Sequence, residues 1–256
     1  MIESALVSTE LLRVRLRASA PLLPALTEFY AGHLELRLAR PADSGLTLEV
    51  GETVLDFAAG GGSPFYHIAL LVPGDRFEAA LAWADDRVEL LPDPETGDLV
   101  FDFTNWDAKA AYFHDPAGSI VELIAHGGIG ERGASGAFAA DELLGLSEVG
   151  IVCDPPAAAE ELRRELGLEL WDGTIDGEDR LAFVGEKART LILCRADRPW
   201  LPTGRPAEAH PVEVVLAGEP GGGVALEGGG RVSRRATGEA PTVRASPSPR
   251  HDITGG

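Results

Sequence analysis

Four stretches of the sequence begin alike, and this internal repetition is the feature that most limits the fold. Each begins with an alternating or apolar run that predicts a strand, and the first three continue into a run that predicts a helix. The pairs are Leu12–Ser19 with Leu22–Tyr30, Tyr66–Val72 with Arg76–Trp83, and Val149–Cys153 with Ala157–Leu166, and the fourth strand is Val212–Leu216. Short β-branched or alternating runs follow each helix. The repeated unit is therefore βαβββ, and strand-rich units with one helix each predict an α+β fold.

These units divide the chain into segments. We expect a domain over residues 1–128 with modules at 9–58 and 65–126, a linker at 129–144, and a third βαβββ-like module with the first strand of an incomplete fourth at 145–218. Residues 219–256 are rich in Gly, Pro and Arg and contain no aromatic residue. Such a segment buries too little apolar surface to offset its ordering entropy, so we expect a disordered tail.

Charge and cysteine content exclude several classes of protein. The formal net charge is −19, and such a surface repels nucleic acid and anionic lipid, so we expect neither as a partner. No apolar run approaches the length of a membrane span, and the first residues do not have the pattern of a signal peptide. The chain has two cysteines, Cys153 and Cys194, which we expect to be small core residues of a cytoplasmic protein.

Two motifs carry a resemblance to a known family. Phe29-Tyr30 closes the first predicted helix, and Tyr112–Leu123 reads YFHDPAGSIVEL, a strand, a turn and a strand. These motifs resemble the vicinal-oxygen-chelate superfamily, which contains glyoxalases, fosfomycin and bleomycin resistance proteins and ring-cleaving dioxygenases. The resemblance covers residues 9–126 strongly and 145–218 weakly. It implies repeated modules that form cupped mixed β-sheets with the active site inside, so we expect the first two modules to share one concave sheet.

The resemblance implies that His67 and Glu122 are metal ligands. An imidazole and a carboxylate on neighbouring strands can share a divalent ion. Alternation places Ile120, Glu122 and Ile124 on one face of a strand, where an unpartnered carboxylate is costly to bury. The expected cofactor is a divalent ion such as Fe, Mn, Zn or Ni. The alternatives are a core histidine bonded to the backbone and a glutamate in a structural salt bridge.

The third ligand of such a site is not evident in the sequence. The resemblance implies that it comes from the first strand of the partner module, where Arg13 and Arg15 stand, and arginine does not ligate metals. Glu49 and Asp56 are substitutes on later strands of the first module. An inward arginine paired with Glu122 is the rival interpretation, and it predicts a metal-free cup.

The second half of the chain departs further from the family pattern. Glu148 stands where the histidine of the third module would be, and no second DPxG motif follows. We therefore expect the third and fourth modules to be a supporting half without a metal site.

Other residues have more than one interpretation. Tyr112 lies ten residues before Glu122, and cross-strand pairing brings the two together unless the register shifts. The resemblance then implies that Tyr112 orients the substrate, and we name Tyr112 and Glu122 as candidate catalytic residues. We expect Trp106 to fill the core. Four other histidines are expected at the surface or in turns, and they are His33, His114, His126 and His251.

Three functions follow from these features. The first is a metal-dependent enzyme on a small substrate with vicinal oxygens, either a glyoxalase-like lyase or a ring-cleaving dioxygenase. The second is a metal-free protein that sequesters a small molecule, as bleomycin resistance proteins do. The third is an oligomeric accessory protein such as a homodimer, because modules of this superfamily pair across subunits. His67 and Glu122 favour the enzyme, since a sequestering cup needs neither.

Overall fold

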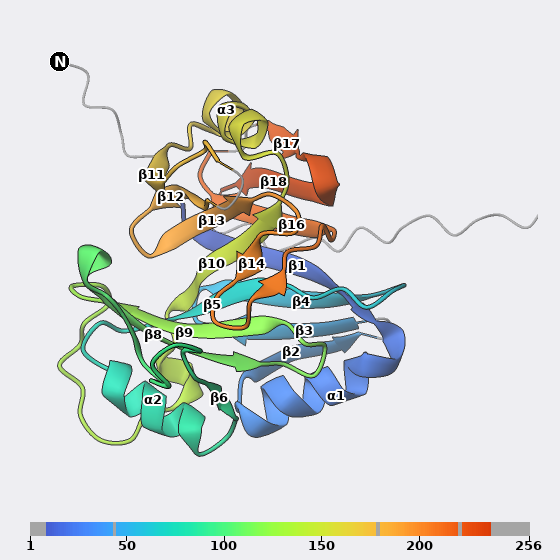
Figure 1. Ribbon diagram of the computed structural model, residues 1–256. Helices are drawn as coiled ribbons and strands as arrows, with labels where there is room; N and C mark the ends of the chain where they lie inside the picture. The colour runs from blue at the N-terminus through green and yellow to red at the C-terminus, as the bar shows by residue number, and fades with distance from the viewer. Residues whose placement is uncertain (1–8, 43–44, 178–179, 220–221, 237–256) are drawn as a thin grey trace, which may run out of the picture.

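Two mixed β-sheets with helices at their ends make up the protein in its computed structural model (Figure 1). The structure describes residues 9–42, 45–177, 180–219 and 222–236. The α+β class and the repeated strand-rich modules expected from the sequence are confirmed. Within the described ranges, no helix is both long enough and apolar enough to cross a bilayer.

Four modules follow one another along the chain. The first contains β1 (Leu11–Ser19), η1 (Ala20–Leu22), α1 (Leu23–Thr27), η2 (Glu28–His33), β2 (Arg37–Ala42), β3 (Gly45–Val50) and β4 (Thr53–Gly60). The second contains β5 (His67–Val72), α2 (Phe77–Asp85), β6 (Leu90–Leu91), β7 (Phe101–Phe103), η3 (Thr104–Trp106), β8 (Ala108–His114) and β9 (Ile120–His126).

The second half repeats this plan. The third module contains η4 (Ala140–Glu142), β10 (Gly145–Val152), α3 (Pro155–Leu166), β11 (Leu170–Gly173), β12 (Ala182–Glu186) and β13 (Arg189–Cys194). A small hairpin follows, made of β14 (Pro199–Trp200) and β15 (Arg205–Pro206). The fourth module contains β16 (Val212–Ala217), β17 (Gly223–Ala225), η5 (Glu227–Gly229) and β18 (Gly230–Arg235).

The modules pair differently from the expectation. The seven-stranded sheet has the order β17-β18-β16-β1-β4-β3-β2, so it joins the fourth module to the first. The nine-stranded sheet has the order β11-β12-β13-β10-β5-β9-β8-β6, with β7 on β8, so it joins the third module to the second. In each sheet the first strands of two modules pair antiparallel, β1 with β16 and β5 with β10. The expectation that residues 9–58 and 65–126 share one concave sheet is therefore wrong.

The expected disordered tail is wrong for residues 222–236, which contain β17, η5 and β18. Strand β18 pairs parallel with β16, with Val214 opposite Val232, and Val232 is fully buried. Strands β17 and β18 extend the fourth module beyond its first strand, β16, which pairs with β1 and so gives the first module a partner within the chain. Residues 220–221 and 237–256 lie outside the described residues.

Each sheet has one face in the main core. On β1, Val14, Leu16 and Ala18 enter this core, while Arg13 and Arg17 alternate onto the other face. On β5, Ile68, Leu70 and Val72 enter the same core, together with apolar side chains of α2 and α3. A second apolar cluster, rich in aromatic side chains, lies on the opposite face of the nine-stranded sheet. Strand alternation thus produces two distinct open faces, a polar one on the first sheet and an apolar one on the second.

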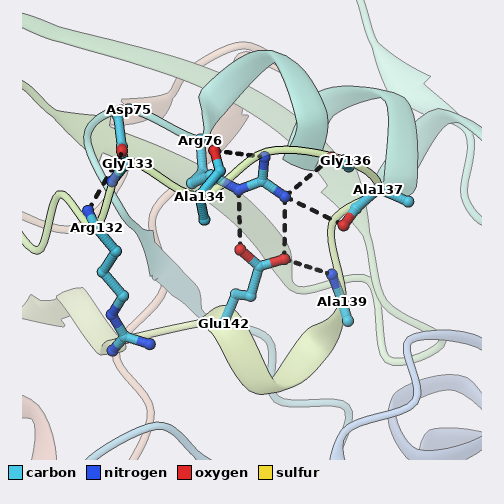
Figure 2. Close-up of polar contacts among 9 residues, drawn as sticks. All are labelled: Asp75, Arg76, Arg132, Gly133, Ala134, Gly136, Ala137, Ala139 and Glu142. Atoms are coloured by element: carbon cyan, nitrogen blue, oxygen red, sulfur yellow. Dashed lines mark hydrogen bonds and ion pairs between the residues drawn. The ribbon is translucent and has the colours of Figure 1, made fainter.

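Residues 129–144, expected to be a linker, are anchored by Arg76 at the start of α2 (Figure 2). The Arg76 guanidinium donates to both carboxylate oxygens of Glu142, at 2.9 Å from Nε and 3.1 Å from Nη2. It also donates to the carbonyl oxygens of Ala134, Gly136 and Ala137. A planar guanidinium with several donors suits this task, because one side chain fixes several acceptors at once.

Arg76→Met is expected to lower the midpoint of thermal unfolding and to speed hydrogen exchange of the amides in 134–142. The substitution removes the guanidinium donor from three carbonyl groups and from the Glu142 carboxylate, which keeps only the backbone N–H of Ala139. Lys109→Met is the matched control, because it breaks a more exposed ion pair with Glu78 beside the same helix, and exposed pairs contribute little. Equal effects of the two substitutions on both measurements would contradict the anchoring role.

Candidate metal centre

His67 is the first residue of β5, a strand whose six residues are all buried. Because Ile68, Leu70 and Val72 enter the main core, His67 and Ala69 lie on the face that carries the aromatic cluster. Strand β9 runs parallel beside β5, with His67 opposite Ile120 and Ala69 opposite Glu122. The fold therefore places His67 and Glu122 on one face of one sheet.

Glu122 is the one acidic residue of β9, in which every residue is buried. Its neighbours on the same face, Ile120 and Ile124, belong to the aromatic-rich cluster. The His67 Nε2 atom lies 3.3 Å from Glu122 Oε2. On the other side, β8 places Tyr112 directly opposite Glu122, so the register brings these residues together as the spacing predicts.

Glu148 completes the cluster from β10. This strand pairs antiparallel with β5, with Ala69 opposite Glu148. The Glu148 Oε2 atom lies 3.9 Å from His67 Nε2, and one ligand atom from each of the three residues lies within 4.8 Å of the others. The third module, expected to be a supporting half without a metal site, thus contributes the third residue of this cluster.

The pKa values of His67 and Glu122 are shifted by burial and by their neighbours. Loss of hydration alone would lower the pKa of His67, but hydrogen bonds and charge interactions with Glu122 and Glu148 outweigh it and raise the pKa to about 9. Burial raises the pKa of Glu122 to about 7, with Glu148 adding to the rise and His67 and Tyr112 opposing it. The His67 shift reflects the two carboxylates beside it, whereas the Glu122 shift reflects mainly its loss of hydration.

A cavity of about 240 Å³ opens onto these three residues. Its walls are mostly apolar and aromatic, and they are formed by Phe103, Trp106, Tyr112, Leu181, Phe183, Ile192, Trp200 and Leu201, with Arg198 also present. Trp106, expected to fill the core, instead walls this cavity. Its ring centroid lies 4.6 Å from that of Phe183, so aromatic residues of the second and third modules close one side of the cup together.

The two paired modules occupy equivalent positions in the sheet. Glu148 pairs with Thr190 and Gly150 with Ile192 in β13, just as His67 pairs with Ile120 and Ala69 with Glu122 in β9. Ile192 therefore occupies the position equivalent to Glu122. The cluster has three polar donors, and the fourth equivalent position carries an apolar side chain that offers no donor.

The arginines of β1 lie in the other sheet and do not contact Glu122. Arg13 forms an ion pair with Asp56, and the Arg15 Nε atom lies 3.7 Å from the same carboxylate. Thr47 donates a hydrogen bond of 2.8 Å to Asp56. The rival interpretation, in which an inward arginine neutralises Glu122, is therefore wrong. Neither substitute ligand, Glu49 or Asp56, belongs to the cluster.

His126 was expected at the surface or in a turn, but it is fully buried at the end of β9. Alternation places it on the same face as Glu122, and its ring lies 6.5 Å from the Trp171 ring. Burial lowers its pKa. It is not one of the three clustered donors, nor does it line the cavity.

Comparisons with known proteins place this geometry in context. No family model matches the sequence, and no curated protein matches it either. Among solved structures, a candidate dioxygenase from Bacillus subtilis subsp. subtilis str. 168 is similar over 90% of this chain and 86% of its own, with 17% identity and a TM-score of 0.56. Glyoxalase I from Zea mays is similar over 80% of this chain and 74% of its own, with 16% identity and a TM-score of 0.50.

The chain has the vicinal-oxygen-chelate fold. The expected fold is thereby confirmed. At these sequence identities the likeness concerns the fold alone, so any activity must be argued from the site itself.

Proposed function

We propose that the protein is a metal-dependent enzyme that acts on a small substrate through two neighbouring oxygen atoms of that substrate. The observation that carries this proposal is the convergence of His67, Glu122 and Glu148 at one cavity. The three side chains come from three adjacent strands, and each is at most 5% exposed. Buried acidic groups without compensation are costly, whereas a bound cation would make the same arrangement favourable.

The donor set fits a divalent ion. One imidazole nitrogen and two carboxylate oxygens suit Fe, Mn, Zn or Ni in their divalent states. Two carboxylates carry the charge that neutralises a dication. Three protein ligands beside a cavity, with no fourth side-chain donor among the described residues, are typical of catalytic rather than structural sites.

The bound ion would supply Lewis-acid stabilisation of negative charge that develops on the substrate oxygens. The side chains of the cup would perform the remaining tasks. The pKa of Tyr112 is well above its usual value, first because of burial and then because of Glu122 and Glu148. Its hydroxyl therefore stays protonated and can orient a substrate oxygen. The apolar walls would exclude water. A glyoxalase-like lyase and a ring-cleaving dioxygenase both require such a site.

Titration of the metal-free protein with Co²⁺, Mn²⁺ and Zn²⁺ tests the proposal. The wild type should bind one ion per chain, and His67→Ala and Glu122→Ala should each weaken binding by about tenfold or more, since each removes a direct ligand. Isothermal calorimetry measures stoichiometry and affinity together. If the wild type binds no ion at about millimolar concentration, the metal-free sequestering protein becomes the better interpretation, with Phe103, Trp106 and Phe183 holding the ligand by stacking.

A further inference from the structure

The hairpin of β14 and β15 lies over the edge of the cup. Its two arms are joined by backbone hydrogen bonds of 2.8 Å from Ala207 to the Arg198 carbonyl and from Asp197 to the Ala207 carbonyl. Arg205 fastens it to the second module, because its Nη1 atom donates to the Gly118 carbonyl at 2.9 Å. The Arg205 guanidinium also lies 3.3 Å from the centroid of the Phe65 ring. The hairpin is therefore a fixed part of the wall.

Trp200 projects from this hairpin onto His67. The two rings are stacked, with centroids 5.1 Å apart and planes 22° apart, and Trp200 is 5% exposed. A metal-ligating histidine usually donates its second nitrogen to a carbonyl or carboxylate. No such partner of His67 Nδ1 is found among the described residues, so stacking on Trp200 takes the place of that support.

Gly150 of β10 provides the slot for the indole. A Cβ atom at this position would lie 2.8 Å from Trp200 Cη2 and 3.4 Å from His67 Cβ. Any larger residue at position 150 would therefore displace the indole from His67. The indole of Trp200, in close contact with Gly150 and His67, is therefore one wall of the cavity that Phe103, Trp106 and Phe183 also line.

We propose that Trp200 is the specificity-determining residue of this site, and that it limits the substrate to a molecule of about one ring in size. This inference rests on the proposed function, because it assumes that the substrate approaches the His67, Glu122 and Glu148 cluster. Removal of the indole would join its volume to the cavity of about 240 Å³ and admit a larger substrate. A pocket wall discriminates by size when it is fixed, as this hairpin is.

A series of three hydroxamates of increasing size tests whether Trp200 limits the size of the bound molecule. Acetohydroxamate, benzohydroxamate and 2-naphthohydroxamate each chelate a metal through two neighbouring oxygens and differ in bulk. Their binding to the Co²⁺-loaded protein is followed by visible absorbance. The wild type should bind benzohydroxamate about tenfold more tightly than 2-naphthohydroxamate, and Trp200→Ala should remove or reverse this preference. Acetohydroxamate affinity should change by no more than about threefold.

The ratio of probe affinities separates selection from general damage. A change in metal affinity affects all three hydroxamates alike and leaves their ratios unchanged. Trp200→Phe should give an intermediate ratio, and it carries the test alone if Trp200→Ala does not fold. Trp83→Phe, a change in a buried tryptophan of α2, is the matched control and should leave the ratios at the wild-type values. Unchanged ratios in both Trp200 variants would overturn the inference.

Metal binding and size selection are measured separately. If the wild type binds no Co²⁺, the proposed function fails. Binding of the three hydroxamates to the metal-free protein is then measured by ligand-observed NMR. Loss of the preference for benzohydroxamate in Trp200→Ala would then still support Trp200 as the wall that sets size. An unchanged preference would reject that role as well.

Discussion

Glu148→Ala is expected to lower the affinity for Co²⁺ by about a hundredfold or more, which exceeds the usual loss from outer-shell substitutions. The carboxylate of Glu148 is one of three donors that lie within 4.8 Å of one another. Its removal leaves one imidazole and one carboxylate, so the ion would lose both a ligand and half of the neutralising charge. Titration of metal-free protein, followed by the visible absorbance of Co²⁺, measures the affinity directly.

Glu49→Gln is the control for this experiment. Glu49 would be a substitute ligand only if the first two modules shared a sheet. It lies instead in the seven-stranded sheet, where its carboxylate is 3.1 Å from the guanidinium of Arg37. Its substitution should leave the Co²⁺ affinity unchanged. A loss caused by Glu49→Gln, together with wild-type affinity in Glu148→Ala, would mean that the site forms from the first two modules in solution.

The fold could be predicted from the sequence because its signals are local. Alternation, helix periodicity and the turn at Asp115–Gly118 each depend on residues close together in the chain. Helix α3 shows this well, since it begins at Pro155 and ends at Leu166. The next residue, Gly167, adopts the left-handed conformation at φ 65°. Proline at the first turn and glycine after the last are expected at these positions.

The pairing of the modules could not be predicted in the same way. All four modules begin with a strand that can accept a partner, and local patterns do not distinguish the partners. β1 pairs with β16, and the sheet continues through β18, which lies in a segment of low apolar content. In β18, Val232 is fully buried between Val224 of β17 and Val214 of β16, but one such residue gave little sign of a strand in the composition.

The error in pairing also determined which residues were considered for the third ligand. Once the first module was taken as the partner, Arg13 and Arg15 stood at the ligand position. A signal for Glu148 was nevertheless present, because it is the one charged residue in the apolar run of β10. The cost of burying an unpartnered carboxylate, which supported Glu122, applies equally to Glu148. Glu122 lies in the last strand of the second module, and Glu148 lies in the first strand of the third. Two buried carboxylates in these positions indicate that the two modules share one polar site.

Asp115→Ala is expected to destabilise the protein by about 3 kcal/mol or more, since several buried donors lose one acceptor. Asp115 belongs to the turn of the YFHDPAGSIVEL motif. Its carboxylate accepts hydrogen bonds from the backbone N–H groups of Ala117 and Ser119, at 2.8 Å and 2.9 Å. It also accepts a bond of 3.0 Å from the hydroxyl of Tyr30, which is fully buried in the first module. The motif residue therefore ties two modules together and does not touch the metal cluster.

Tyr30→Phe and Asp115→Asn separate the contributions to this effect. Burial raises the pKa of Asp115, while the hydrogen bonds from Ser119, Tyr30 and Ala117 oppose the rise, so the carboxylate depends on its donors. Asp115→Asn keeps an acceptor for the two backbone donors and should cost about 1 kcal/mol, and Tyr30→Phe should cost about 2 kcal/mol because it removes a hydrogen bond to a charged group.

Urea unfolding of the single and double variants measures the coupling between the two residues. In the Tyr30→Phe background, Asp115→Ala should cost less than in the wild type, because no tyrosine hydroxyl is left without a partner. The Co²⁺ affinity of Asp115→Asn should equal that of the wild type, since Asp115 is not part of the donor cluster. Strictly additive free energies would show that the hydrogen bond does not couple the modules. A lower Co²⁺ affinity with normal stability would instead assign the motif aspartate to the site, because a purely structural residue cannot weaken the metal without weakening the fold.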